Sequence, residues 1–394
     1  MAIADIQQYA GTSSQAPDES ALLDVFHQVP VEPVSANGVY LWAADGSRYL
    51  DFYGGHAVAL LGHSHPTLVR VLHEQASRLF FQTNAVPLAQ RERAAAKLLA
   101  FAPRGLAKVF FVNSGTEANE NALRIAFLAT RRDRVVCVQG GFHGRTAASA
   151  AVTDGHDKWY AFPALPFRIT TVPFDDVDAL QASMDSDVAA LIVEPVQGMA
   201  GARPCATAFL QAARTLTRDC GAVLIFDEVQ CGMGRTGYPF ASQAYDVTPD
   251  MLTTAKGLAG GFPAGAVVVS DTLAAAVRKG DLGTTFGAGP LACALIEAVV
   301  DLLSDGSVLA RVRDLSDRIR AVCVVGPVVA VQGMGLLLGL RTSRPAADVL
   351  CALRARHILA GSSADPRVLR LLPPLLLQEQ HVDALASALA EIEP

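Results

Sequence analysis

Short apolar runs alternate with longer amphipathic segments between about residues 66 and 290 of this chain of 394 residues. Each run is short and rich in apolar residues, as a strand buried on both faces is expected to be. Such alternation is typical of a largely parallel sheet with helices on both faces. We therefore predict an α/β fold, with strands at 108–112, 135–138, 189–193, 223–226 and 266–269.

The two ends of the chain follow other patterns. Asp45-Gly46 separates two short apolar runs, which is the standard signal of a β-hairpin. Towards the C-terminus helical periodicity dominates, and the chain closes with a strand-like run at 368–372 and a helix from His381. The first 20 residues are polar and have no clear period, so we predict a mobile lead-in there.

The length and the net charge of the chain limit the classes of protein to which it can belong. A chain of 394 residues exceeds one typical core, so we expect two domains. The formal net charge is −6 with dispersed Lys and Arg, which favours a small-molecule partner over nucleic acid. No apolar run approaches the roughly 20 residues of a membrane-spanning helix. The first basic residue is Arg48, so no basic targeting segment is evident and we predict a cytoplasmic protein.

A segment with the pattern of a phosphate site runs from Val109 to Glu120. It combines a buried strand, a turn of small polar residues and a helix that begins near Thr116. Free backbone N–H groups and the positive end of the helix dipole meet in such a turn and attract a phosphate. A plain capped helix explains Thr116 and Glu120 equally well, so this segment alone leaves both interpretations open.

Two further strand ends carry reactive groups. An apolar run ends in Asp227 and Glu228, at the edge where parallel sheets bind their ligands. Lys256 follows the next short strand and precedes a Gly-rich turn. A strand-end Asp is often a cap or a turn former, and a single Lys is usually a solvated surface group. A Lys held near a desolvated carbonyl is instead a Schiff-base former, so the two residues are candidates for catalysis.

Seven motifs stand in order along most of the chain. They are Asp45-Gly46 with Tyr49-Leu-Asp51, Leu61-Gly-His-Ser-His-Pro66, Asn113-Ser-Gly-Thr-Glu-Ala-Asn119, Phe142-His-Gly-Arg-Thr146, Glu194-Pro-Val-Gln-Gly198, Asp227-Glu-Val-Gln230 with Gly232-Met-Gly-Arg-Thr-Gly237, and Lys256. Together they resemble the class III aminotransferases of fold type I. The resemblance implies pyridoxal 5′-phosphate as cofactor, a large domain at 61–290 with a mostly parallel sheet between helices, and a small α+β domain built from 1–60 and 291–394.

The resemblance implies a role for each residue around the cofactor. Lys256 would bind the cofactor covalently and then act as general base. Asp227 would pair with the pyridine nitrogen and keep the ring protonated, as an electron sink requires. The other implied cofactor contacts are Ser114, Gly115 and Thr116 in the phosphate turn, Phe142 and Val229 on the two ring faces, and Gln230 at the ring hydroxyl.

Substrate residues and a shared active site are implied as well. Arg145 resembles the residue that grips a substrate carboxylate, a bidentate task that suits a guanidinium group. Arg370 stands where the family binds the carboxylate of glutamate and 2-oxoglutarate. Thr285 would reach the phosphate in the neighbouring subunit of a homodimer, and Thr284 beside it would contact substrate. No metal is implied.

One departure from the family pattern concerns Arg370. Relatives usually carry Glu after the position of Gly198, and that Glu pairs with the arginine while the ω-amino substrate binds. Here the residue is Met199. We hypothesise that Met199 weakens discrimination between α- and ω-amino donors, in which case Met199→Glu changes the donor profile.

Three features suggest other functions. Gly232-Met-Gly-Arg-Thr-Gly237 matches the GxGxxG fingerprint of nicotinamide-dependent oxidoreductases, but Tyr238-Pro239 follows where a helix should open. His63 and His65 lie in a Gly/Pro turn without a third ligand, so we predict no metal site. A non-catalytic cofactor-binding sensor would carry a DNA-binding domain or a basic segment, and neither is evident in the sequence.

Within the family, the acetylornithine aminotransferases look most similar. They imply transfer of the ω-amino group of N-acetylornithine to 2-oxoglutarate, a step of arginine biosynthesis. Succinylornithine, ornithine, 4-aminobutyrate and carrier-linked lysine stay open as donors. A methylene or an acyl cap changes the binding energy of a pocket by only about 1 to 3 kcal/mol, through side chains that the sequence does not place.

Overall fold

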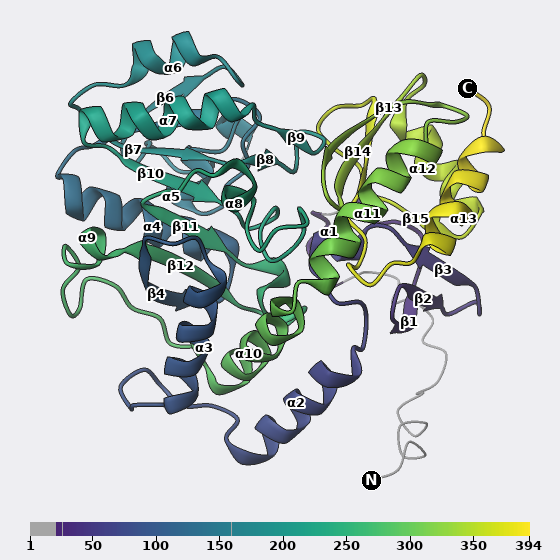
Figure 1. The fold of residues 1–394 in the computed structure, drawn as a ribbon, viewed down its shortest axis with the longest axis horizontal. Coiled ribbons are helices and arrows are strands. Elements are labelled where there is room, and N and C mark those ends of the chain that lie inside the picture. Colours follow the sequence, from purple (N-terminus) through teal and green to yellow (C-terminus); the bar gives the residue numbers. More distant parts are fainter. Residues whose placement is uncertain (1–20, 26, 159) are drawn as a thin grey trace.

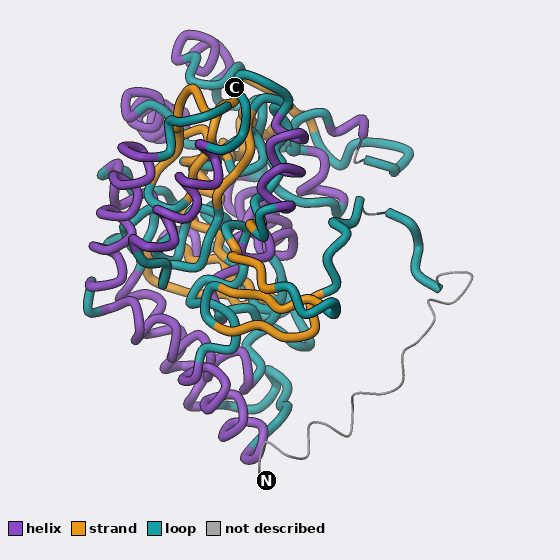
Figure 2. The backbone as a smooth tube through the Cα atoms, turned by 90° about the vertical axis from the view of Figure 1, so that its right-hand side faces the viewer, coloured by secondary structure: helices purple, strands orange, loops and turns teal. Residues whose placement is uncertain are grey.

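A computed structural model describes residues 21–25, 27–158 and 160–394. The mobile lead-in predicted at residues 1–20 lies outside this part of the chain. A seven-stranded sheet occupies one side of the molecule, two smaller sheets occupy the other, and a two-stranded sheet lies between them (Figure 1). Seen from the side, strands run through the interior and helices gather along one edge (Figure 2).

The large sheet is mostly parallel, as the sequence predicts. Its order is β4-β12-β11-β10-β7-β5-β6, and only β12 runs antiparallel to both of its neighbours. All five predicted strands are present. The strands of the sheet are β4 (Leu106–Val112), β5 (Arg134–Val138), β6 (Arg168–Val172), β7 (Val188–Val193), β10 (Val223–Asp227), β11 (Met251–Thr254) and β12 (Gly265–Ser270).

Helices cover both faces of this sheet. Leu123 of α4 packs with Ile192 in the core of one face, and Phe209 of α7 packs with Leu224 in the core of the other. Every residue of β7 is buried, as a central strand covered on both sides requires. The helices are α2 (Pro66–Arg78), α3 (Ala89–Phe101), α4 (Gly115–Thr130), α5 (Ala147–Ala151), α6 (Val177–Ser183), α7 (Thr207–Cys220), α8 (Ala241–Tyr245), α9 (Asp271–Ala274) and α10 (Pro290–Ser304).

The two ends of the chain fold together. β15 pairs in parallel with β3, which places Ile358 opposite Leu50. The hairpin predicted around Asp45-Gly46 is present, since β2 and β3 pair antiparallel on either side of it. The elements near the N-terminus are β1 (Pro33–Asn37), β2 (Tyr40–Ala43), β3 (Arg48–Asp51) and α1 (Gly54–Ala57).

The C-terminal segment contains more strand than its periodicity suggested. The expected strand and final helix are present as β16 and α13, but β13 and β14 form an antiparallel hairpin where helical periodicity was expected to dominate. Their alternation is masked because Leu337–Leu340 is buried without a break. The elements are α11 (Ser307–Val322), β13 (Val328–Met334), β14 (Leu337–Thr342), α12 (Ala346–Ala355), β15 (Ile358–Leu359), β16 (Val368–Leu371) and α13 (Glu379–Ala390).

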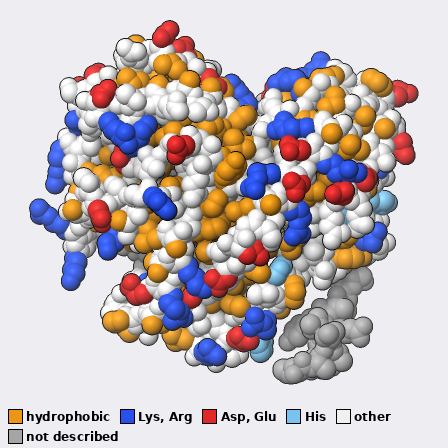
Figure 3. All heavy atoms as spheres, in the orientation of Figure 1, with side chains coloured by type: hydrophobic (Ala, Val, Ile, Leu, Met, Phe, Trp, Pro, Cys, Tyr) orange, Lys and Arg blue, Asp and Glu red, His pale blue; other side chains and the backbone are white. Residues whose placement is uncertain are grey.

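One apolar core continues across the molecule. It joins Leu50 near the N-terminus, Leu252 of the large sheet and Leu385 near the C-terminus. Figure 3 shows apolar side chains on this face along the junction of the two bodies, below a notch at the top. α10 packs against α2 and α3. The division at 60 and 290 stays a prediction. In the described part of the chain, no helix combines the length and apolar character needed to cross a membrane.

Candidate active site

The carboxyl ends of β10 and β11 bring Asp227 and Lys256 together. The two strands are parallel neighbours, with Asp227 opposite Thr253, and Lys256 lies two residues after the end of β11. Lys256 has a φ of +46°, in the left-handed region that a residue with a Cβ rarely adopts. Such strain is found where a side chain must be aimed, and here it begins the short turn η3 (Lys256–Ala259).

Hydrogen bonds fix the carboxylate of Asp227 from three sides. Its side chain is 3% exposed. Asn119 Nδ2 donates to Oδ2 at 2.7 Å, His143 Nδ1 lies 2.8 Å from the same oxygen, and the backbone N–H of Val229 donates to Oδ1 at 3.0 Å. Thr253 in turn donates to Asn119 Oδ1 at 2.7 Å, which orients the amide. These donors hold the buried carboxylate in one orientation.

The amine of Lys256 lies in a desolvated site. Burial lowers the pKa of Lys256, and the nearby carboxylates of Asp227 and Glu194 oppose that shift. Arg370 lowers the pKa further. A larger fraction of the amine is therefore uncharged near neutral pH, as a nucleophile and a base both require.

The predicted phosphate turn precedes α4, which begins at Gly115, one residue before the predicted start. Ser114 is the N-cap residue, and its Oγ accepts a hydrogen bond from Glu117 N at 3.2 Å. The backbone N–H groups of Gly115 and Thr116 belong to the first turn and have no intrahelical acceptor. A Cβ at Gly115 would lie 2.7 Å from Val229 Cγ1, so glycine lets the strand end approach the turn.

Phe142 and Arg145 lie beside this turn. The Arg145 guanidinium carbon is 5.1 Å from the centre of the Phe142 ring. The Phe142 backbone N–H donates to Glu194 Oε1 at 2.8 Å, and Gly198 N donates to Oε2 at 3.1 Å. Burial, with the charge of Asp227, raises the pKa of Glu194 to about 7. Glu194 thus ties the segments that carry Phe142 and Gly198 to each other.

Arg370 projects from β16 into the same region. It is 1% exposed. Its Nε donates to the Ser362 carbonyl at 2.6 Å, and its Nη1 donates to the Gly198 carbonyl at 3.2 Å and to Gln230 Oε1 at 3.4 Å. Burial lowers the pKa of Arg370, although the guanidinium stays charged in proteins. Gln230 therefore reaches Arg370 with its oxygen and leaves its NH₂ group for another partner.

The two threonines predicted to serve the active site, Thr284 and Thr285, lie in different environments. Thr284 Oγ1 accepts hydrogen bonds from Gly287 N at 3.0 Å and from Asn113 Nδ2 at 3.5 Å, which places it beside the phosphate turn. Thr285 is exposed, and no hydrogen bond joins it to any residue that the structure describes. The structure does not bring Thr285 into the site of its own chain.

Sequence reasoning assigned no role to Asn119, His143 or Glu194. All three stand inside the motifs that carried the family resemblance, and this was the available signal. Their contacts are long-range in sequence, so their partners became visible only in the fold. Two motifs with competing interpretations have structural roles instead: His63 Nε2 lies 2.8 Å from Asp51, and 232–237 is a series of turns.

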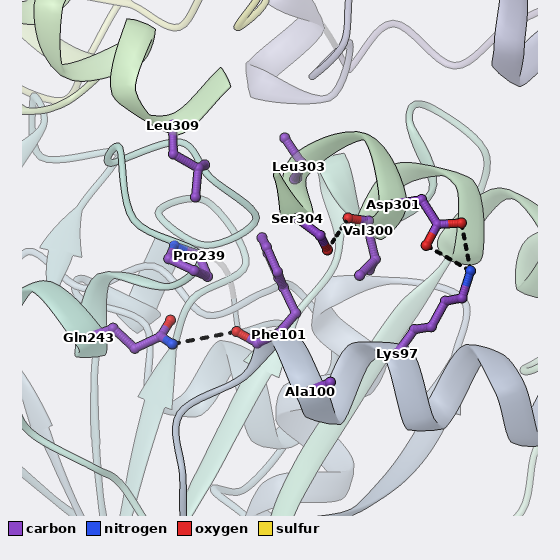
Figure 4. Close-up of a pocket in the computed structure, with 10 residues that line it drawn as sticks. All are labelled: Lys97, Ala100, Phe101, Pro239, Gln243, Val300, Asp301, Leu303, Ser304 and Leu309. Atoms are coloured by element: carbon purple, nitrogen blue, oxygen red, sulfur yellow. Dashed lines mark hydrogen bonds and ion pairs between the residues drawn. The ribbon is translucent and has the colours of Figure 1, made fainter. Parts of the chain in front are cut away.

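A cavity of about 430 Å³ lies elsewhere, between α3 and α10 (Figure 4). Lys97 pairs with Asp301 across its edge at 2.5 Å. Neither Lys256 nor Asp227 lines this cavity. The one lysine that lines it, Lys97, is partly exposed and already paired with Asp301, so the strand-end cluster is the candidate active site.

The residues of the strand-end cluster fit pyridoxal phosphate. Asp227 Oδ1 accepts one hydrogen bond from the described residues and keeps a lone pair for a protonated ring nitrogen. Free N–H groups at Gly115 and Thr116 suit a phosphate at the start of α4. Lys256 supplies the amine. Such a cluster, on helix-covered parallel strands, defines an enzyme that uses pyridoxal phosphate.

The chain belongs to the class III aminotransferases, because the model of the family "Aminotransferase class-III" matches residues 24–392. It is a pyridoxal-phosphate-dependent transaminase of fold type I. The acetylornithine aminotransferase of Streptomyces coelicolor is 43% identical over 91% of this chain and 90% of its own length. That of Methanocaldococcus jannaschii is 38% identical over 94% and 95%.

Solved structures show the same fold. The ornithine aminotransferase of Toxoplasma gondii, crystallised with partial occupancy of PLP, aligns with a TM-score of 0.88 at 28% identity, over 94% of this chain and 91% of its own. The acetylornithine aminotransferase of Elizabethkingia anophelis aligns with a TM-score of 0.83 at 30% identity, over 94% and 96%.

Proposed function

We propose that the chain transfers the ω-amino group of N-acetylornithine to 2-oxoglutarate. The observation that carries the proposal is the placement of Lys256 beside Asp227, whose carboxylate is fixed by Asn119, His143 and the Val229 N–H. The choice of donor is supported by the similar curated proteins, which are named acetylornithine aminotransferases.

The residues of the site divide the chemistry between them. Pyridoxal phosphate, when bound, accepts the amino group and delocalises the electron pair that proton removal leaves. Lys256 moves the proton, and burial favours the uncharged amine that a base requires by lowering its pKa. Asp227 would hold the ring nitrogen in its protonated form. Phe142 and Val229 would orient the ring, and Gln230 Nε2 would bond the ring hydroxyl. Ser114, Gly115 and Thr116 would hold the phosphate.

Two arginines bind the substrates in this proposal. Arg145 takes the carboxylate at the far end of each substrate, where its position against Phe142 limits its movement. Arg370 takes the carboxylate next to the reacting carbon of 2-oxoglutarate, because it lies close enough to Lys256 to lower the pKa of that amine. Thr284 contributes from beside the phosphate turn.

The active form is a homodimer with shared sites. Thr285 is exposed next to Phe286, which is itself 66% exposed. The Phe286 ring packs in a tilted arrangement against Phe81, another exposed ring, with 5.5 Å between the ring centres. An exposed apolar patch beside a site favours burial against another protein surface. Thr285 would then reach the partner's phosphate. A Thr285→Ala enzyme that keeps its cofactor affinity would contradict this assignment.

We place the reaction in arginine biosynthesis, since the product of N-acetylornithine transamination retains the ornithine skeleton. Cytoplasmic residence stays a prediction of the sequence.

The first test is the visible absorption of the purified enzyme with bound pyridoxal phosphate. N-acetylornithine, N-succinylornithine, ornithine, lysine and 4-aminobutyrate are each added without an acceptor. We expect the band to change fastest with N-acetylornithine and to be lost in Lys256→Ala. If another donor reacts fastest, the chemistry holds and the donor is wrong. A protein that cannot be loaded with the cofactor would exclude the proposal as a whole.

A further inference from the structure

Arg370 is a buried cation without a carboxylate partner among the residues that the structure describes. We infer that, while an ω-amino donor reacts, a small monovalent carboxylate such as formate binds to Arg370. The inference rests on the proposed function, because it concerns the half-reaction in which the donor brings no carboxylate to this position. It gives the carboxylate site at Arg370 a second occupant and predicts activation by that anion.

The hydrogen bonds of Arg370 leave part of the guanidinium open. An arginine has five N–H donors. Nε and Nη1 donate to Ser362, Gly198 and Gln230, and among the described residues none accepts a hydrogen bond from Nη2. Nη2 is also not one of the fully buried polar atoms that lack a partner. Since the residue as a whole is 1% exposed, the open edge of the guanidinium faces a restricted space in the site.

The three acceptors of Arg370 are neutral oxygens. In the part of the chain that the structure describes, no Asp or Glu forms an ion pair with Arg370. Glu194 is the carboxylate whose charge raises the pKa of Arg370, and its two oxygens already accept hydrogen bonds from Phe142 N and Gly198 N. A buried guanidinium without a counter-ion is costly, so an anion of the right size should be bound.

Other positive groups surround the same space. Burial, followed by the charges of Arg370, Lys256 and Arg145, lowers the pKa of His56 to about 4. His56 is therefore neutral at working pH and adds no charge of its own. Arg370 and Arg145 keep their charge, and together they create a positive potential around His56. Such a potential concentrates small anions and opposes the ammonium group of an arriving donor.

The two proposed substrates differ at this position. 2-Oxoglutarate carries a carboxylate on its reacting carbon and can neutralise Arg370 itself. The reacting carbon of N-acetylornithine is a CH₂ group that bears the amine and no carboxylate, so its complex leaves the guanidinium unpaired and leaves room beside it. Residue 199 follows the Gly198 carbonyl that Arg370 contacts, and as Met199 it supplies no charge. A bound formate would neutralise the charge of Arg370 and occupy the space beside its guanidinium.

The inference predicts that formate affects the binding of donor and acceptor in opposite directions, and this difference can be tested. Each half-reaction is followed separately through the absorption of the bound cofactor, with sodium formate exchanged for a bulky sulfonate at constant ionic strength. We expect formate to lower the apparent Kd for the donor N-acetylornithine and to raise that for the acceptor. For the donor the change should be about tenfold at saturation, the usual effect of one charge-assisted hydrogen bond. For the acceptor, which competes with formate for Arg370, the apparent Kd should rise in proportion to the formate concentration. Equal effects on both half-reactions would overturn the inference.

A matched pair of variants separates charge from shape. Met199→Glu brings a carboxylate to the position, and the effect of formate should disappear. Met199→Gln is close in size and neutral, and the effect should persist. Formate should also raise the Tm of the loaded wild-type enzyme and of Met199→Gln, but not that of Arg370→Met. A Tm response that Arg370→Met retains contradicts the site.

The thermal measurement does not depend on the donor. If N-acetylornithine fails to react while formate still stabilises the enzyme through Arg370, the proposed donor is wrong and the anion site stands. If N-acetylornithine reacts and formate changes neither its Kd nor the Tm, the anion site is wrong and the proposed function stands.

Discussion

Asp227 and Arg370 are both buried charged residues of one site, but their hydrogen-bond partners differ in kind. The carboxylate of Asp227 is surrounded by an amide, an imidazole and a backbone N–H, all of which the chain supplies. The guanidinium of Arg370 donates only to neutral oxygens of the described residues. A fully bonded charge suits a cofactor that stays in place. A partly bonded charge suits a substrate carboxylate that must arrive and leave.

Removal of the charge of Asp227 should have the largest effect. Asp227→Asn keeps the shape of the side chain but withdraws the charge that protonates the ring nitrogen. We expect kcat to fall about 10³-fold in both half-reactions, the scale on which a fixed electrostatic group contributes to catalysis. Stopped-flow absorption measures both. A fall confined to one half-reaction would contradict the role of Asp227.

Removal of the charge of Arg370 should affect only one substrate strongly. In Arg370→Met, we expect the Michaelis constant for the acceptor, 2-oxoglutarate, to rise about 10²-fold, because a desolvated carboxylate loses its charged partner. The Kd for the donor N-acetylornithine should change far less. The matched control is Arg320→Met, since Arg320 contacts backbone carbonyls of Val331 and Gly333, away from the site. Comparable losses for both substrates would remove the distinction between the two charges.

The support around Asp227 can be weakened without removing its charge. His143→Gln deletes the imidazole that contacts Asp227 Oδ2, and we expect kcat to fall about tenfold, as is usual for residues that orient a reactive group. As a positioning residue, His143 should leave the Michaelis constant for the acceptor unchanged, and its loss should shift the pH profile of kcat. A change in that Michaelis constant alone would point to general disorder of the site.

A buried carboxylate that hydrogen-bonds to neutral donors should make stability depend on pH. Burial raises the pKa of Glu228 to about 7, although Ser242 N and Ala241 N donate to it. Between about pH 5 and pH 7 the folded protein then binds a proton that the unfolded chain does not, so the free energy of unfolding falls as pH rises.

The measurement is denaturant unfolding at about pH 5 and at about pH 8. Glu228→Gln should reduce the difference in stability between the two by on the order of 2 kcal/mol. Glu74→Gln, at an exposed position, is the control and should leave it unchanged. A pH dependence that survives in Glu228→Gln assigns the effect to another group, and Glu194 is the first to test.

The large sheet was predictable because each of its strands is a local signal. The run 223–226 is apolar, ends in an acid and lies between helices, so its burial and its functional end follow from neighbouring residues. The hairpin of β13 and β14 was missed. Its register joins Val331 to Leu340, and the apolar residues of β14 do not alternate, because both faces of that strand are covered.

The sequence by itself determined the class of sheet, the strand-end positions of Asp227 and Lys256, and a helix start at the phosphate turn. Periodicity and the chemistry of nearby residues are sufficient for these features. Only the tertiary structure decided what surrounds each charge. Asn119 and His143 reach Asp227 from other segments, and Arg370 meets Gly198 and Gln230 across well over a hundred residues of chain. Such contacts depend on how packed elements are placed in space, and no local pattern records that placement.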